Sequence, residues 1–429
     1  MTHALPLPRP LAGLGLGLCL AALAAPASAD QYHYRDMLLG ERAIGMGGAY
    51  TAVSDDPSGL FYNPAGVVYR QETNLSASVN AFQRTHTTYK GALGSKNWER
   101  RSNALLPNFF GVVQPLSSGV VGFSFAVPDS GQEDQDQEFD HLPGTSTDRY
   151  VINFNHQLQL YKVGPSYARA ITDNLSVGMT LYLHYRTDQI TSNQWVRQNN
   201  GDYEWLNQYY QTSEVGVEPV LGVMWSPLPK LSLGLSVRKT RIINASTQSQ
   251  VTCVSDIAGN SNSVCQNSSG LVDPANPPGP AIAKSHARRK LPLEATVGVA
   301  YFQSPRLLLS ADFSYHTGTD DDFQQRAPTW NAALGTEFYF TGTWALRSGI
   351  YSNRANTPSI KSGDVNQQEH IDYYGLSLSL THFTRNSSIS GGVNLTRGTG
   401  KAQVVGGSTA IQNVSAGTQL FFLSTSYAF

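Results

Sequence analysis

The sequence contains few charged residues. Asp, Glu, Lys and Arg make up 14% of its 429 residues, whereas about a quarter is usual for soluble domains. The formal net charge is −1, so the chain lacks the basic surplus with which proteins neutralise phosphate backbones. We therefore expect no nucleic-acid partner.

Long apolar runs are also missing after the first thirty residues. No later segment approaches the roughly 18 apolar residues that suggest a membrane-spanning helix. A membrane protein without such helices must be a closed barrel, because only closure pairs every strand's backbone groups in lipid.

Cysteine is scarce, with only three residues in the chain. Cys19 lies in the apolar stretch LAGLGLGLCLAALAA, which is followed by the small-residue triplet Ala-Ser-Ala. This pattern predicts a secretory signal peptide over residues 1–29, removed before Asp30. Cys253 and Cys265 then remain in an exported chain and are separated by a polar segment, so we expect them to form a disulfide.

Alternation of apolar and polar residues recurs from residue 73 to the end, for example along residues 175–185. A period of two is the signal, individually weak, of strands in a membrane barrel. Segmentation at turn residues predicts fourteen strands, an even number that suits a bacterial barrel. Their predicted ranges are 73–84, 107–116, 119–127, 152–170, 175–191, 208–226, 231–245, 291–303, 306–317, 328–340, 343–354, 371–384, 387–397 and 414–429.

The connections between these segments alternate in length. Short turns such as TDN and TGT alternate with long polar segments that we predict to be extracellular loops. A barrel with short periplasmic turns produces this alternation, whereas a soluble sandwich gives no reason for it. The predicted loops are 85–106, 128–151, 192–207, 246–290, 318–327, 355–370 and 398–413.

The last strand ends on an aromatic residue. Phe429, Tyr427, Thr425, Leu423 and Phe421 fall on one face of it. This ending resembles the recognition signature of bacterial outer-membrane barrels, which implies that Phe429 and Tyr427 serve as a signal for the barrel-assembly machinery. An ordinary last strand of a soluble sandwich is the alternative.

The stretch GMGGAYTAVSDDPSGLFYNPAGV, residues 45–67, has glycines and paired aspartates but lacks the Lys of a phosphate loop and the alternating ligands of a calcium loop. Asp56 before Pro57 predicts a helix cap followed by one short turn, and Asn63 before Pro64 predicts its end. The glycines allow tight bends. We expect a compact, capped unit containing Gly45, Gly47, Gly48, Asp55, Asp56, Pro57, Asn63, Pro64, Ala65 and Gly66.

The longer stretch RAIGMGGAYTAVSDDPSGLFYNPAGV is similar to the N-terminal hatch of the FadL/TodX-type transporters of hydrophobic compounds. Together with the signal peptide, strand pattern and terminal Phe, the resemblance covers effectively the whole chain. It implies an all-β fold, a transmembrane antiparallel β-barrel over residues 71–429 with a hatch of residues 30–70 in its lumen. Asn63, Pro64, Ala65 and Gly66 match the family motif. Related hatch-like motifs also occur in secretion-shuttle barrels, so the motif indicates a plugged barrel more firmly than fatty-acid transport.

Several predicted inward positions carry arginine, histidine or aromatic side chains. An arginine beside an apolar pocket can hold a carboxylate, and the aromatic residues favour an apolar path. Alternatively, such charges pair with one another across a wet lumen. The candidate ligand contacts are Arg186, Arg238, Arg347, His184, Tyr182, Phe302, Tyr339 and Tyr351.

These observations predict a bacterial outer-membrane protein that takes up hydrophobic molecules passively, either long-chain fatty acids or aromatic hydrocarbons. We expect a monomer that contacts outer-membrane lipid and lipopolysaccharide and needs no metal or cofactor. An enzyme is disfavoured because no G-x-S-x-G nucleophile elbow is present. A non-transporting plugged barrel with a structural or secretion-accessory role remains the alternative.

Overall fold

A computed structural model describes residues 32–34, 37–69, 72–93, 96–142, 146–255, 281–320, 325–365, 367–404 and 409–429. The predicted signal peptide and Cys265 lie outside these residues, so the signal peptide and the disulfide stay predictions. Cys253 is 3% exposed. No helix among the described residues is both long and apolar enough to cross a bilayer.

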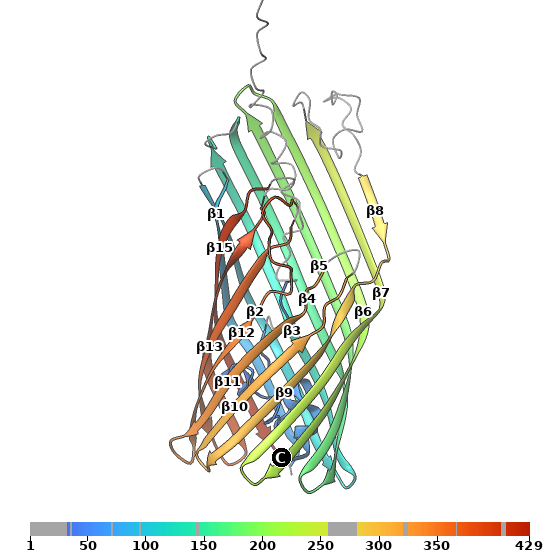
Figure 1. Ribbon diagram of the computed structural model, residues 1–429, viewed down its shortest axis with the longest axis vertical. Coiled ribbons are helices and arrows are strands. Elements are labelled where there is room, and N and C mark those ends of the chain that lie inside the picture. The colour runs from blue at the N-terminus through green and yellow to red at the C-terminus, as the bar shows by residue number, and fades with distance from the viewer. Residues whose placement is uncertain are drawn as a thin grey trace, which may run out of the picture.

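Fourteen antiparallel strands of the described residues form a closed barrel, as the sequence predicts (Figure 1). Neighbouring strands follow one another in the chain, and β1 pairs with β15 to complete the ring. A short additional strand, β8 (Ala281–Ser285), pairs with the upper end of β7. The ring strands are β1 (Asn74–Leu93), β2 (Lys96–Leu116), β3 (Gly119–Asp140), β4 (Thr147–Thr172), β5 (Leu175–Gln198), β6 (Tyr203–Leu228), β7 (Leu231–Ser255), β9 (Lys290–Ser304), β10 (Leu307–His316), β11 (Thr329–Tyr339), β12 (Trp344–Asn353), β13 (His370–Phe383), β14 (Ser387–Ala402) and β15 (Gln412–Ala428).

The wall of the barrel is much taller on one side. Strands β3 to β7 contain 22 to 26 residues, whereas β10 to β12 contain 10 or 11. Figure 1 shows the tall wall rising above the low one, with the short turns at the lower end. Strands of 9–11 residues already cross a bilayer. The tall wall therefore extends well beyond the part that a membrane requires.

Parts of the predicted loops are strands of the tall wall, so those loop predictions are wrong. Residues 85–93, 96–106 and 128–140 belong to strands, and so do 147–151, 192–198, 203–207 and 246–255. Above the bilayer a strand need not be apolar on its outer face, so the apolar–polar alternation disappears although backbone pairing continues. The sequence pattern located the apolar belt correctly and missed the strand extensions above it.

The two faces of the strands follow the predicted register. On β7, Ser232 is 5% exposed and faces the lumen, while its neighbours Leu231 and Leu233 are only partly buried. Apolar outward side chains such as Leu181 and Leu183 form the belt. Its lower edge carries exposed aromatic residues, including Trp225, Tyr301, Phe340, Tyr427 and Phe429.

Residues 37–69 pack inside the lower part of the barrel (Figure 1). They contain α1 (Glu41–Gly45), α2 (Gly59–Tyr62) and a 3-10 helix, η1 (Pro64–Tyr69). We call this segment the hatch. The Asp56 carboxylate accepts the Ser58 backbone N–H at 2.7 Å, but α2 begins at Gly59 with Ser58 as its N-cap residue, two residues later than predicted. Asn63 is extended after α2, as the sequence predicts. The 3-10 helix was not predicted.

Inward-facing glycines allow the hatch to lie directly on the wall. A methyl group at any of several wall glycines would collide with the backbone or inner side-chain atoms of residues 46–65. In three cases two glycines are directly paired on neighbouring strands, so that the wall has a flat area without side chains. We call these areas the glycine seats. These pairs are Gly178 with Gly222, Gly234 with Gly298, and Gly335 with Gly349.

Candidate functional site

A cluster of charges, buried except for Asp55, joins the hatch to the wall. Arg42 of α1 donates to both Glu337 oxygens at 2.8 and 3.0 Å and also pairs with Asp55. Arg347 of β12 donates to Glu337 at 2.6 Å and to Glu41 at 3.1 Å. Burial lowers the pKa of Arg42, but Asp55 and Glu337 raise it, leaving it well above its usual value. We call these five residues the latch.

Side chains of the wall also bind backbone groups of the hatch. Asp312 accepts the N–H groups of Tyr50 and Thr51 at 3.0 and 2.9 Å. Thr180 donates to the Leu60 carbonyl at 2.8 Å. Ser176 donates to the Ala65 carbonyl at 2.9 Å. Because buried backbone groups need partners, these bonds stabilise the hatch in the closed lumen.

The side chain of Asn63, in the hatch motif, makes three hydrogen bonds to backbone groups. Its amide nitrogen donates to the carbonyls of Thr51 and Val223 at 2.8 and 3.0 Å. Its amide oxygen accepts the Ala65 N–H at 3.2 Å. The side chain therefore joins two hatch segments to β6 and uses both its donor and its acceptor capacity.

A cavity of about 180 Å³ lies above the hatch. Met37, Leu38, Phe61 and Tyr62 contribute its hatch side, and Leu160, Leu291 and Pro292 are among its apolar wall residues. Lys162, Arg186, Arg238, Arg289 and Arg326 also line it, with Asp129, Glu218 and Glu294. Five cationic side chains thus face three carboxylates beside an apolar floor. This combination suits a molecule that is apolar with a polar or anionic end.

These cations already have partners. Lys162 donates to Glu218 at 2.7 Å, Arg186 to Asp188 at 2.8 Å and Arg289 to Glu214 at 2.6 Å. Arg238 donates to the Phe61 carbonyl and lies 4.5 Å from the centre of the Phe61 ring. The alternative predicted from the sequence, pairing of lumen charges, therefore describes these residues well.

His184 differs from these paired groups. Its side chain lines the cavity and is 2% exposed, yet neither ring nitrogen has a hydrogen-bond partner among the described residues. A buried imidazole without a partner is costly. His184 is therefore available to bind a ligand in this cavity, and so is His316, which also lines it, is 2% exposed and has no hydrogen-bond partner for either ring nitrogen in the part of the chain that the structure describes.

Four of the eight candidate lumen residues line cavities. Arg186, Arg238 and His184 line the cavity above the hatch. Tyr351 lines a second cavity of about 120 Å³ and donates to Asn394. Neither cavity is lined by the other four. Arg347 lies in the latch, Tyr182 donates to or accepts from Ser124 at 2.7 Å, Tyr339 stacks on Phe383, and Phe302 is 38% exposed near the lower end.

Sequence reasoning missed the floor of the cavity. Phe61 and Tyr62 lie in the hatch motif, but aromatic residues in a short turn are typical of a packed core and gave no sign of facing a cavity. Lys162, Glu218 and Glu294 occupy inward positions of the alternating pattern. Pairing Lys162 with Glu218 requires the register of three strands, which the alternation alone does not provide.

No protein-family model matches the chain, and no curated protein matches it. Solved structures do. A Pseudomonas aeruginosa FadL homologue is 15% identical with a TM-score of 0.62, covering 92% of this chain and 100% of its own. The Pseudomonas putida toluene transporter TodX is 12% identical with a TM-score of 0.64, covering 91% and 98%. The Ralstonia pickettii toluene transporter TbuX is 13% identical with a TM-score of 0.60, also covering 91% and 98%. The chain therefore has the fold of the FadL/TodX-type channels, as the hatch motif predicts.

Proposed function

We propose that the protein is an outer-membrane channel that takes up hydrophobic molecules passively. The observation that carries this proposal is the cavity directly above the hatch, whose floor is formed by hatch residues. A molecule in this cavity touches the segment that fills the lower lumen. Ligand binding and the position of the hatch are therefore physically linked.

The cavity favours an amphipathic substrate such as a long-chain fatty acid. Its tail would pack on Met37, Leu38 and Phe61, and its carboxyl group would bind at His184 near Arg186. An aromatic hydrocarbon would use the apolar floor alone. The solved neighbours TodX and TbuX are toluene transporters, which supports this second substrate class for the same fold.

The proposed arrangement in the cell follows from the belt and the hatch. Residues 30–70 act as the hatch, residues 71–429 form the barrel, and the short turns face the periplasm. Phe429 donates its N–H to the Thr73 carbonyl at 3.0 Å, so the terminal residue completes the seam that the assembly machinery closes. Uptake then depends on binding and hatch movement in a monomer, with no chemical step.

A non-transporting barrel is the second candidate function. The latch and the wall hydrogen bonds leave a well-satisfied hatch, which also suits a permanent plug in a structural or secretion-accessory protein. The two functions differ in one expectation, because only a transporter needs the cavity to bind and release its ligand.

Uptake measurements test the proposal. Cells that lack their own fatty-acid channel should accumulate labelled oleate or toluene when they express the chain, and mass spectrometry should find co-purified lipid. His184→Ala should weaken oleate binding by about 2–12-fold, the equivalent of one lost hydrogen bond of about 0.5–1.5 kcal/mol. Ser424→Ala, a buried inward position outside both cavities, is the matched control. Normal barrel assembly without uptake of either compound would favour the structural role.

A further inference from the structure

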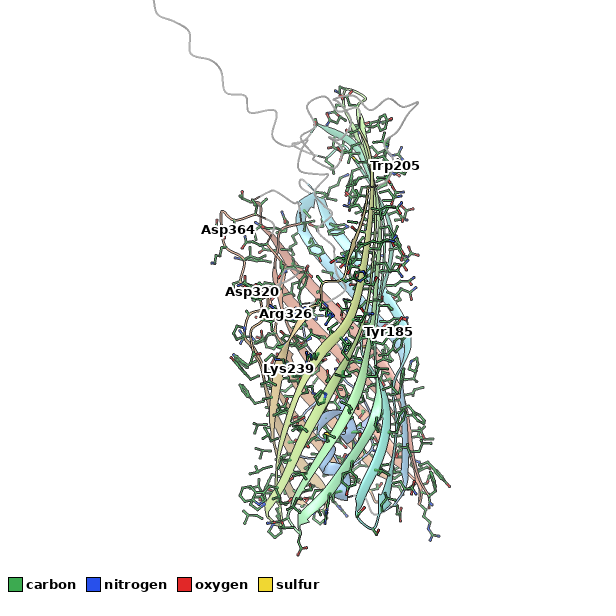
Figure 2. The ribbon with its side chains drawn as sticks, turned by 90° about the vertical axis from the view of Figure 1, so that its right-hand side faces the viewer. Tyr185, Trp205, Lys239, Asp320, Arg326 and Asp364 are labelled. Carbon is green, nitrogen blue, oxygen red and sulfur yellow. The ribbon has the colours of Figure 1, made fainter. Side chains whose placement is uncertain are left out.

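The outer face of the tall wall changes character above the apolar belt. Tyr185 marks the upper edge of the belt, and Trp205 lies near the top of the same wall (Figure 2). Between these levels β4, β5, β6 and β7 continue as paired strands. This outward surface covers residues 151–159, 187–195, 205–213 and 246–254, and we call it the amide face.

Side chains on the amide face form rows across the four strands. Directly paired residues bring together Gln157, Gln189, Gln211 and Gln248 in one row. A higher row consists of Asn153, Asn193, Asn207 and Thr252. The other polar rows contain only Asn, Gln, Ser, Thr and Tyr, and no outward residue of the face is charged. Each amide offers both donors and acceptors.

Two tryptophans stand side by side at the top of the amide face. Trp195 and Trp205 are directly opposite on β5 and β6. With Val151, Asn153 and Asn193 they line a shallow cavity of about 430 Å³. The Trp205 indole N–H donates to the Asn193 amide oxygen, which orients the ring, and Trp205 is 38% exposed.

We propose that the amide face binds a neutral polysaccharide, namely the sugar chain of the glycolipid in the surrounding outer leaflet. A hexose ring presents C–H groups on its face and hydroxyl groups around its edge. The flat indoles can pack against the face, and the amides can exchange hydrogen bonds with the hydroxyl groups. An uncharged partner matches the four strands of the amide face, which lies between the acidic outward residues Asp134, Asp136 and Glu138 of β3 and Lys284 of β8.

The height of the amide face identifies the source of the sugar. The face begins where the apolar belt ends and continues upward, so it stands in the layer that headgroup sugars occupy in the proposed orientation. Lipid tails do not reach this layer. The inference rests on the proposed outer-membrane location, but it requires neither transport nor movement of the hatch.

Affinity electrophoresis of the full-length, detergent-solubilised protein tests the inference. The gel contains neutral polysaccharide released by mild acid from the lipopolysaccharide of the source organism. We expect the polysaccharide to retard the wild-type protein. Trp195→Ala/Trp205→Ala should weaken binding at least about tenfold because it removes both ring contacts. Gln189→Glu/Gln211→Glu, which preserves side-chain size, should also weaken it.

Trp330→Ala is the matched control, because Trp330 is an exposed outward tryptophan of the low wall. It should bind the polysaccharide like the wild type, and heat-modifiable migration should show that all variants fold. Equal mobility of the wild type with and without polysaccharide would overturn the inference. A wild-type dimer in sedimentation experiments that Trp195→Ala/Trp205→Ala abolishes would overturn it too, because stacked uncharged faces of two copies would then be the partner. Oleate uptake is measured in parallel, so failure of sugar binding is distinguishable from failure of transport.

Discussion

The lower and upper halves of the barrel differ on both faces. In the lower half the lumen is filled by the hatch, held by the latch and by glycine seats, and the outer face is an apolar belt. In the upper half the lumen contains the two cavities, and the outer face of β4 to β7 carries amides and hydroxyl groups beside the acidic outward residues Asp134, Asp136 and Glu138 of β3.

This contrast indicates that the lower half closes the lumen, whereas the upper half carries the groups that can bind a ligand. The lower half seals with backbone contacts and buried ion pairs that involve no ligand. The upper half presents side chains, among them His184, that can bind one. The two halves meet at the hatch residues that line the first cavity, among them Phe61, whose ring packs against Arg238 of the same cavity. A ligand in this cavity can therefore contact the hatch at Met37, Leu38, Thr51, Phe61 and Tyr62.

The largest effect is expected from removing the latch carboxylate. Glu337→Ala leaves Arg42 and Arg347 without their shared buried partner, and breaking a buried pair costs about 3–5 kcal/mol. The hatch should loosen, so trypsin should cleave after Arg42 while the barrel stays folded on gels. The control is Glu138→Ala, which breaks the exposed pair with Arg149 and should cost at most about 1 kcal/mol. Equal protease resistance of both variants would show that the latch does not hold the hatch.

The contrast between the outer faces predicts that the stability cost of an outward arginine depends strongly on its height along the barrel. Leu233→Arg places a charge in the apolar belt and should cost about 2–4 kcal/mol of barrel stability. Gln211→Arg lies on the outer face of the neighbouring strand but above the belt, so it should cost little. Urea unfolding in lipid vesicles measures both values. If they are equal, the boundary of the belt near Tyr185 is wrong.

The glycine seats predict a smaller effect confined to the hatch. Gly349→Leu would place a side chain against Met46 and Gly47, and overpacking of this kind costs about 1–3 kcal/mol. Proteolysis should show a displaced hatch in an intact barrel. Gly391→Leu is the control, because a methyl group there meets only Leu423 at an ordinary distance of 3.5 Å. A protected hatch in Gly349→Leu would mean that the seat is not needed.

The sequence predicted the features that the membrane imposes. A bilayer forces every strand to alternate at its depth, so the number of strands, the short turns and the inward positions of Arg186 and Arg347 could be found. Strand extensions above the belt could not, because residues such as Asn193 and Gln248, which were predicted in loops and lie in β5 and β7, carry no apolar alternation. Polar strands and polar loops look alike in composition.

Partners across the lumen were also beyond the sequence pattern. Arg347 was expected to contact a ligand, but it binds Glu41, 306 positions away, because barrel closure and the inserted hatch bring them together. One available signal was overlooked. Glycines at inward positions of neighbouring strands, such as Gly178 and Gly222, indicate that another backbone approaches the wall there.

The central claim is that uptake requires movement of the hatch. Tethering the hatch to the wall tests this claim most directly. A Cβ atom at Gly111 would lie 3.1 Å from that of Pro57, close to the roughly 3.5–4.5 Å of a disulfide. It would also lie 2.7 Å from the Phe109 ring, which must shift. Pro57→Cys/Gly111→Cys, made in a Cys253→Ser/Cys265→Ser background, can therefore lock the hatch to β2 reversibly. Each single-cysteine variant is a control for oxidation itself.

Labelled oleate uptake is then measured in oxidising and in reducing conditions. The account predicts that uptake falls when the tether forms and recovers on reduction, while both single-cysteine controls and barrel migration on gels stay unchanged. Equal uptake by the tethered and the reduced protein would contradict it, because hatch movement would then play no part in transport.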